Sequence, residues 1–155
     1  MTVHRTLAWI LATWFGCGRA PVAPGTVGTL GALPLYLAAL AGGRAGVVAA
    51  ALGATLVGVW AAGVVARDLG AKDPQVVVID EVAGMLVTLI PIARASALSV
   101  ATGFVLFRVL DATKPGPIRW LERLPRGWGI VLDDVGAGAI AAVVLAAMRV
   151  GGLLP

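Results

Sequence analysis

Five of the eight acidic residues lie inside or at the edge of strongly apolar segments, where a charge is costly. They are Asp80, Glu81, Asp111, Asp133 and Asp134. A carboxylate within a membrane span costs about 2.5–3.5 kcal/mol on insertion scales, and clustered carboxylates repel one another at low dielectric. The nearby cations Arg108 and Lys114 offset two charges, so the others must bind a proton, water or a metal ion. An all-carboxylate set favours a hard divalent cation, Mg²⁺ above all.

Other ionisable residues fit this chemistry less well. Zinc is not expected, because the only softer ligands are His4 and Cys17, which do not cluster in the sequence. Asp68, Asp73 and Glu122 lie in polar stretches beside basic residues, so we expect them to be solvated surface charges.

The composition indicates that lipid surrounds these residues. Of 155 residues, 59% are hydrophobic and only 13% are charged, and the mean hydropathy is +0.96. A water-soluble domain of this size has about a quarter of its residues charged. The net charge of +4 therefore indicates contact with anionic lipid rather than with nucleic acid, because no basic run interleaved with polar residues is present.

Five apolar segments are long enough, or nearly so, to cross a bilayer as helices. They cover residues 26–41, 45–66, 76–93, 95–110 and 130–150. The apolar stretch 7–15 is shorter and contains Trp9 and Trp14, which favours a retained interfacial helix over a cleaved signal peptide. The predicted fold is an all-α, polytopic integral membrane helix bundle with about five transmembrane helices. It forms one domain, residues 1–155, with the interfacial helix and a Gly/Pro loop in 1–25 and the bundle in 26–150.

The basic residues orient this bundle. With five crossings, the N-terminal region and the two long loops share one side, which carries nine Lys and Arg residues against three on the other: Arg5, Arg19, Arg67, Lys72, Arg108, Lys114, Arg119, Arg123 and Arg126 against Arg44, Arg94 and Arg149. The positive-inside rule then places the long loops in the cytoplasm. The same segment order brings all five costly carboxylates to that face.

Each carboxylate also has a simpler explanation. Asp80, and either Asp133 or Asp134, could cap the start of a helix. Asp111 lies at a helix C-terminus, where the macrodipole disfavours an anion, and could pair with Arg108 or Lys114 three residues away. The convergence of three separate segments on one face favours a shared functional site. Gly84, four residues after Asp80, would allow another backbone to approach closely there.

The glycine- and proline-rich stretch 16–29 lies on the same face. Its glycines, including Gly25, could turn backbone N–H groups toward a phosphate, Arg19 supplies a positive charge, and Thr26 could cap the following helix. A plain turn before a capped helix explains the same residues.

Three sequence blocks resemble one family. They are GCGRAPVAPGTVGTL at 16–30, VIDEVAGMLVT at 78–88, and FVLFRVLDATKPGPIR at 104–119 followed by GIVLDDVGAG at 129–138. In these blocks the chain resembles bacterial phosphatidylglycerophosphatase A, a Mg²⁺-dependent membrane lipid phosphatase. The resemblance implies hydrolysis of the phosphomonoester of phosphatidylglycerophosphate to phosphatidylglycerol and inorganic phosphate. Together with the charge asymmetry, it predicts a multi-pass protein of the bacterial cytoplasmic (inner) membrane with its active site facing the cytoplasm.

Together, the residues and the resemblance assign roles. The five carboxylates would be catalytic and hold one or two Mg²⁺ ions. Substrate would be bound by Arg108, Lys114, Arg19, Gly25 and Thr26. The attacking group is either water or an aspartate. The sequence leaves the oligomeric state open.

Two other classes of protein fit part of the pattern. A small cation-binding transporter or channel could also carry a carboxylate cluster, although its charges would more often lie near the bilayer midplane. A scaffold for another enzyme would show no activity when purified.

Overall fold

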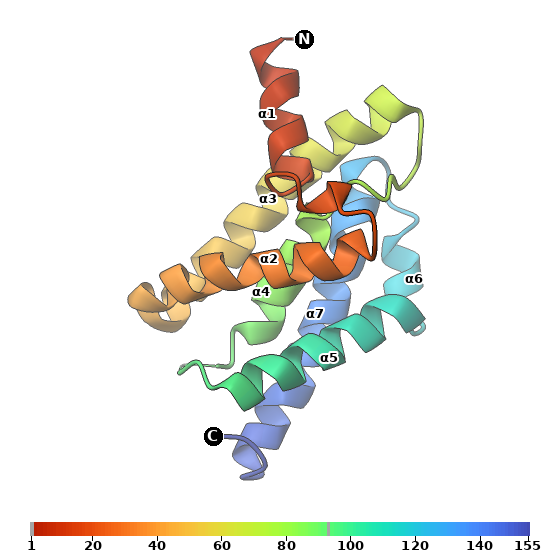
Figure 1. The fold of residues 1–155 in the computed structure, drawn as a ribbon. Helices are drawn as coiled ribbons and strands as arrows, with labels where there is room; N and C mark the ends of the chain where they lie inside the picture. The colour runs from red at the N-terminus through yellow and green to blue at the C-terminus, as the bar shows by residue number, and fades with distance from the viewer. Residues whose placement is uncertain (1, 93) are drawn as a thin grey trace.

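A computed structural model describes residues 2–92 and 94–155, in which the regular elements are all helical. Figure 1 shows their arrangement around a central helix, α4. In chain order they are α1 (Val3–Ala12), η1 (Cys17–Arg19), α2 (Pro24–Ala39), η2 (Leu40–Gly42), α3 (Gly43–Leu69), α4 (Ile79–Leu89), α5 (Ala97–Thr113), α6 (Ile118–Leu121) and α7 (Gly127–Val150). The prediction of an all-α fold is confirmed.

Helix α4 is the core of the bundle and is shorter than predicted. It contacts α2, α3, α5 and α7, and most of its 11 residues are buried. At 1.5 Å per residue it is about 16 Å long, too short to cross about 30 Å of hydrocarbon alone. The predicted segment 76–93, which reaches outside the described residues at position 93, is therefore too long. The apolar composition predicted a spanning helix here because a helix buried in the protein core is as apolar as one that spans a membrane.

Within the residues that the structure describes, two helical stretches are long and apolar enough to cross a bilayer, against the five predicted. Pro24–Leu69 contains α2, η2 and α3, and Gly127–Val150 is α7. They include the predicted segments 26–41, 45–66 and 130–150. Helix α5 matches segment 95–110 and has 17 residues. Helix α7 begins three residues before its predicted start.

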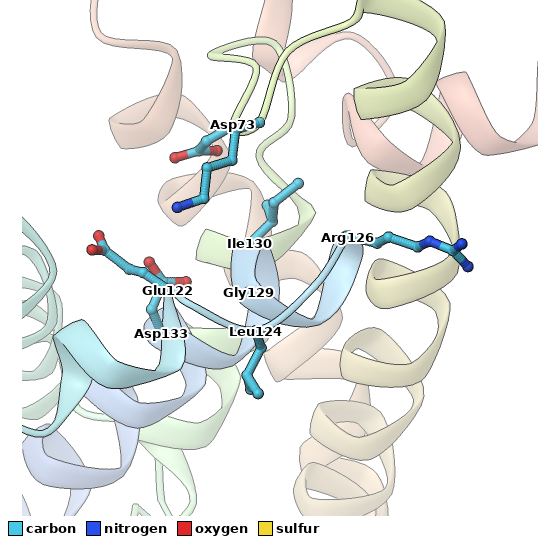
Figure 2. Close-up of a pocket in the computed structure, with 8 residues that line it drawn as sticks. Asp73, Glu122, Leu124, Arg126, Gly129, Ile130 and Asp133 are labelled. Atoms are coloured by element: carbon cyan, nitrogen blue, oxygen red, sulfur yellow. The ribbon is translucent and has the colours of Figure 1, made fainter.

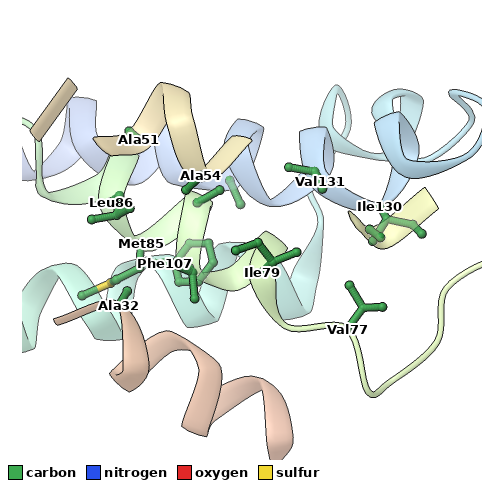
Figure 3. Close-up of a cluster of buried hydrophobic side chains, with 14 of the residues drawn as sticks. Ala32, Ala51, Ala54, Val77, Ile79, Met85, Leu86, Phe107, Ile130 and Val131 are labelled. Atoms are coloured by element: carbon green, nitrogen blue, oxygen red, sulfur yellow. The ribbon is translucent and has the colours of Figure 1, made fainter. Parts of the chain in front are cut away.

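Small residues allow the central helices to pack closely. A Cβ added to Gly84 of α4 would lie 2.7 Å from the Asp134 carbonyl oxygen of α7 and 2.8 Å from Cζ of Phe107 in α5. Gly138 of α7 similarly faces the backbone of Gly84. The close approach predicted at Gly84 is confirmed. Figure 3 shows Ile79 and Met85 of α4 near Phe107 of α5 in the surrounding apolar core.

Helix α1 is anchored to the C-terminal end of α3. Arg5 forms an ion pair with Asp68 (Nη2 to Oδ1, 2.9 Å), and Trp9 Nε1 donates to Asp68 Oδ2 at 2.9 Å. The backbone N–H of Val78, just before α4, donates to the Ala12 carbonyl at 2.9 Å. These contacts hold the α1–α2 connection at the end of the bundle where α4 and α7 begin (Figure 1).

Candidate active site

A polar cleft of about 310 Å³ opens where the starts of α2, α4 and α7 meet the end of α5. All five carboxylates singled out in the sequence line it, together with Arg108, Lys114 and Gly25. The predicted convergence of three chain segments is therefore confirmed. The helices explain it, because α4 and α7 both start at this end while α5 finishes there (Figure 1).

Three of the carboxylates form a compact cluster, the acidic triad Asp80, Glu81 and Asp134. One oxygen from each lies within 4.8 Å of the other two. Asp80 and Glu81 are in the first turn of α4, and Asp134 lies on α7. The side chains of Asp80 and Asp134 are buried, with 7% and 4% of their surface exposed.

Two features of the acidic triad fit a metal ion: its negative charge, and one buried oxygen without a hydrogen-bond partner. Glu81 Oε2 is buried and has no hydrogen-bond partner among the described residues. Leaving a buried charged acceptor unsatisfied costs more than about 1–3 kcal/mol, so this oxygen needs a proton, a water molecule or a metal ion. Carboxylate oxygens alone, with no nearby thiolate or imidazole, match the donor preference of Mg²⁺.

The other two carboxylates already have cationic partners. Arg108 Nη1 lies 2.7 Å from Asp111 Oδ2, one of the two pairings considered from the sequence. Lys114 instead pairs with Asp133 on α7 and with Glu122, whose Oε1 lies 2.9 Å from Nζ. The five carboxylates thus divide into an acidic triad and two ion-paired members.

Helix capping does not explain the buried aspartates. Helix α4 has Val78 as its N-cap, and α7 begins at Gly127, well before Asp133. The Oδ1 atoms of Asp80 and Asp133 accept from the backbone N–H of the next residue, at 3.1 and 3.0 Å. These contacts fix the orientation of each carboxylate within its helix. They do not cap the N–H groups at the start of the helix.

Lys114 and Glu122 form the outer, partly exposed end of the site. Burial favours the neutral amine of Lys114, but hydrogen bonds to Asp133 and Glu122 outweigh it and raise the pKa of Lys114. The hydrogen bond from Lys114 lowers the pKa of Glu122 despite slight burial. Both groups are therefore charged across the neutral range.

Of the residues predicted in the glycine- and proline-rich loop, the cleft is lined by Gly25. A Cβ there would overlap Glu81 Oε1 and lie 3.4 Å from Arg108 Nη1. Thr26 is not the N-cap, because Pro24 starts α2 and Ala23 precedes it in the left-handed region at φ 47°. Proline favours the first turn since it needs no N–H acceptor there. Arg19 lines a different cavity, beside α1.

Two acidic residues expected to be simply solvated belong to this region. Asp73 lines the cleft, and with Glu122 and Asp133 it also lines an adjoining pocket of about 170 Å³. Figure 2 shows Asp73, Glu122 and Asp133 around that pocket, while Arg126 points away from them. The Asp-Pro pair at 73–74 signals a turn before α4, and this was the one sequence feature that could have placed Asp73 here.

Comparison with known proteins identifies the family. The family model of phosphatidylglycerophosphatase A matches residues 10–149. The chain is 41% identical to the Escherichia coli (strain K12) phosphatidylglycerophosphatase A, over 88% of this chain and 80% of the relative. It is 36% identical to the Haemophilus influenzae phosphatidylglycerophosphatase A, over 90% of this chain and 87% of the relative.

A third relative carries a different name. A Bacteroides thetaiotaomicron protein, provisionally named a phosphatidylinositol-3-phosphatase, is 33% identical over 90% of this chain and 92% of its own length. No solved structure matches the chain significantly. The match across residues 10–149, which includes every residue of the acidic triad, shows that the chain belongs to the phosphatidylglycerophosphatase A family of phosphatases.

Proposed function

We propose that this protein is a Mg²⁺-dependent lipid phosphatase that hydrolyses the phosphomonoester of phosphatidylglycerophosphate to phosphatidylglycerol and inorganic phosphate. The substrate follows from the names of the two most similar relatives reported above. The observation that carries the metal requirement is the acidic triad with its unpartnered, buried Glu81 Oε2. One Mg²⁺ held by Asp80, Glu81 and Asp134 would supply Lewis-acid stabilisation of charge on the phosphoryl group.

The remaining residues of the cleft position the phosphoryl group. Arg108 uses Nη1 to hold Asp111, which leaves its other N–H groups for phosphoryl oxygens. Lys114 holds Asp133 and contributes positive charge at the outer edge of the cleft. Gly25 leaves open the space next to Glu81 and Arg108 that a side chain would fill.

The location we propose is the cytoplasmic membrane, with the cleft on the cytoplasmic side. Large apolar side chains are exposed on the outer faces of the long helices: Leu30 and Leu37 of α2, Leu52 and Leu56 of α3, Leu98 and Val105 of α5, and Val143 of α7. Such a surface is stable in lipid and prone to association in water. The nine-to-three excess of basic residues, counted for five crossings, supports an inward-facing cleft end.

This topology has a direct test with single cysteines in a Cys17→Ser background. Cysteine at position 44 should react with an impermeant maleimide added outside the cell, whereas cysteine at position 126 should react only after permeabilisation. Reaction of both from outside would contradict the orientation.

The alternative function, a cation transporter or channel, is less consistent with the geometry. Within residues 2–92 and 94–155 the acidic triad lies at one end of the bundle, and the interior beyond it is the apolar core around Met85, Leu86 and Phe107. A permeation path needs polar groups through the middle of the bilayer.

The experiment is phosphate release from phosphatidylglycerophosphate by the purified, reconstituted protein. We expect release with Mg²⁺, no release with EDTA, and a loss of at least about 100-fold in Asp80→Asn and Asp134→Asn. Asp68→Asn is the matched control, because Asp68 pairs with Arg5 away from the cleft. Near-normal activity in both cleft variants, or activity unaffected by EDTA, would contradict the proposal.

A further inference from the structure

A second, more apolar cavity lies beside α1, and none of its residues lines the active-site cleft. This cavity, called here the α1 groove, has a volume of about 570 Å³. It is lined by Thr6, Trp9, Ile10, Thr13, Phe15, Gly16 and Arg19. Thr6, Trp9 and Ile10 share one face of α1 by their helical spacing, and Thr13, the C-cap, continues that face. The opposite face buries Ala8 and Ala12.

The turn after α1 presents an aromatic side chain at this groove. Trp14 and Phe15 both have left-handed backbone angles, φ 45° and 56°. Trp14 is held by a hydrogen bond from Nε1 to the Gly31 carbonyl at 2.7 Å, whereas the Phe15 side chain is 71% exposed. An exposed phenylalanine next to Ile10, itself 40% exposed, suits contact with hydrocarbon rather than with water.

Arg19 gives the α1 groove one charged end. Its side chain is exposed, and it has no ion-pair partner within the described part of the chain. An apolar groove ending in a free guanidinium is complementary to a phospholipid, whose phosphodiester is an anion joined to acyl chains.

The α1 groove and the active-site cleft are joined by a short piece of chain. Arg19 lines the groove and Ala23 lines the cleft. Four residues of fully extended chain span at most about 14 Å. The groove and the cleft are thus neighbours along the chain, and a phospholipid with two phosphates offers an anion to each of them.

From this continuity we infer that Arg19 binds the phosphodiester of the lipid whose phosphomonoester occupies the cleft, and that the α1 groove receives an acyl chain. The inference rests on the proposed function and adds a binding site to it. It assigns selection of a membrane lipid over a water-soluble phosphomonoester to the α1 groove, and it gives Arg19 a role distant from the reacting phosphorus.

The first test is direct binding of the product lipid, which needs no catalysis. The full-length protein in neutral detergent is titrated with phosphatidylglycerol, and bound lipid is counted by native mass spectrometry. We expect Arg19→Gln to bind about tenfold more weakly, because one charge-assisted hydrogen bond is lost. Arg19→Lys should recover part of the loss, and Phe15→Ala should also weaken binding. Arg123→Gln is the matched control, because Arg123 is exposed and lines neither cavity.

Kinetics then locate the effect. Arg19→Gln should raise the KM for the lipid substrate about tenfold and change kcat less than twofold, since the phosphodiester is not altered in the reaction. Unchanged phosphatidylglycerol binding in Arg19→Gln, or a fall in kcat with KM unchanged, would overturn the inference. If the wild-type protein released no phosphate, the proposed function would fail, while the binding titration would still decide whether the α1 groove takes a lipid.

Discussion

Replacing Gly138 by alanine should separate α4 from α7 and weaken the acidic triad. Gly138 follows Asp134 by four residues, and Gly84 follows Asp80 by four residues, so each glycine lies one turn from a triad carboxylate on the same helix face. The two glycines meet at the helix crossing, where Thr88 Oγ1 donates to the Gly84 carbonyl at 2.9 Å. The crossing therefore sets the distance between the carboxylates of the two helices.

The structure gives the size of the perturbation. A Cβ at Gly138 would lie 3.0 Å from the Gly84 carbonyl carbon and 3.1 Å from its Cα, whereas ordinary contacts begin at about 3.4 Å. The obstacle is backbone on both sides, so no side chain can rotate away and the helices must separate. Overpacking of this kind costs about 1–3 kcal/mol of stability, and displacement of reacting groups by about 1 Å can cost about 100-fold in rate.

The assay combines activity with thermal unfolding. Gly138→Ala should reduce phosphate release about 10- to 100-fold, raise the Mg²⁺ concentration needed for half-maximal activity, and lower the Tm. Gly53→Ala is the control, because Gly53 lies within α3 and a Cβ there meets nothing within 4 Å. It should be neutral or stabilising by up to about 1 kcal/mol through helix propensity. Wild-type activity and Mg²⁺ dependence in Gly138→Ala would refute the argument.

Three further predictions concern residues around the acidic triad. Gly25→Ala would place a Cβ against Glu81 Oε1, so kcat should fall at least about tenfold with little loss of Tm; full activity would show that Gly25 does not limit the space at the cleft. Lys114→Met would leave the buried Asp133 carboxylate without its cationic partner and lower the free energy of unfolding by about 1–3 kcal/mol. Adding Asp133→Asn should restore much of that loss in a double-mutant cycle. Additive losses would mean that the pair is not coupled. The folded-state pKa of Glu122 is lowered, so its contribution to stability is present above the unfolded pKa of about 4.3 and is lost as pH falls through the folded value. The Tm measured from pH 6 to pH 3.5 should therefore fall less steeply in Glu122→Gln than in the wild type. Parallel curves for the two proteins would contradict this.

The meeting of the five carboxylates could be predicted from the sequence because it depends on the order of the segments and on the asymmetry of the basic residues. Asp80 and Asp111 lie in the first turn of α4 and the last turn of α5, and Asp134 lies in the first half of α7. These helices alternate in direction, so the three residues must lie toward the same end of the bundle. The Arg108–Asp111 pair could also be predicted from the sequence, since residues three apart face one another on a helix. Gly84 was identified by its spacing from Asp80.

Long-range side-chain contacts could not be predicted in this way. The pairing of Lys114 with Asp133 joins α5 to α7, and Glu122 completes it from the connection between them. Asp73 reaches the cleft through the path of an irregular loop. The length of α4 was missed because hydropathy measures apolar composition, which burial in protein and burial in lipid both require. The start of α2 was misplaced because Pro24 begins the helix before Thr26 can cap it.

Metal binding measured without catalysis is the most direct test of the central claim, that Asp80, Glu81 and Asp134 hold a divalent cation. Mn²⁺ suits the same carboxylate ligands as Mg²⁺, and its free concentration can be followed by electron paramagnetic resonance during titration of the purified protein. The wild-type protein and Asp68→Asn should bind Mn²⁺ that Mg²⁺ displaces, whereas Glu81→Gln should bind it at least about tenfold more weakly. Equal Mn²⁺ affinity in Glu81→Gln and the wild type would contradict the account.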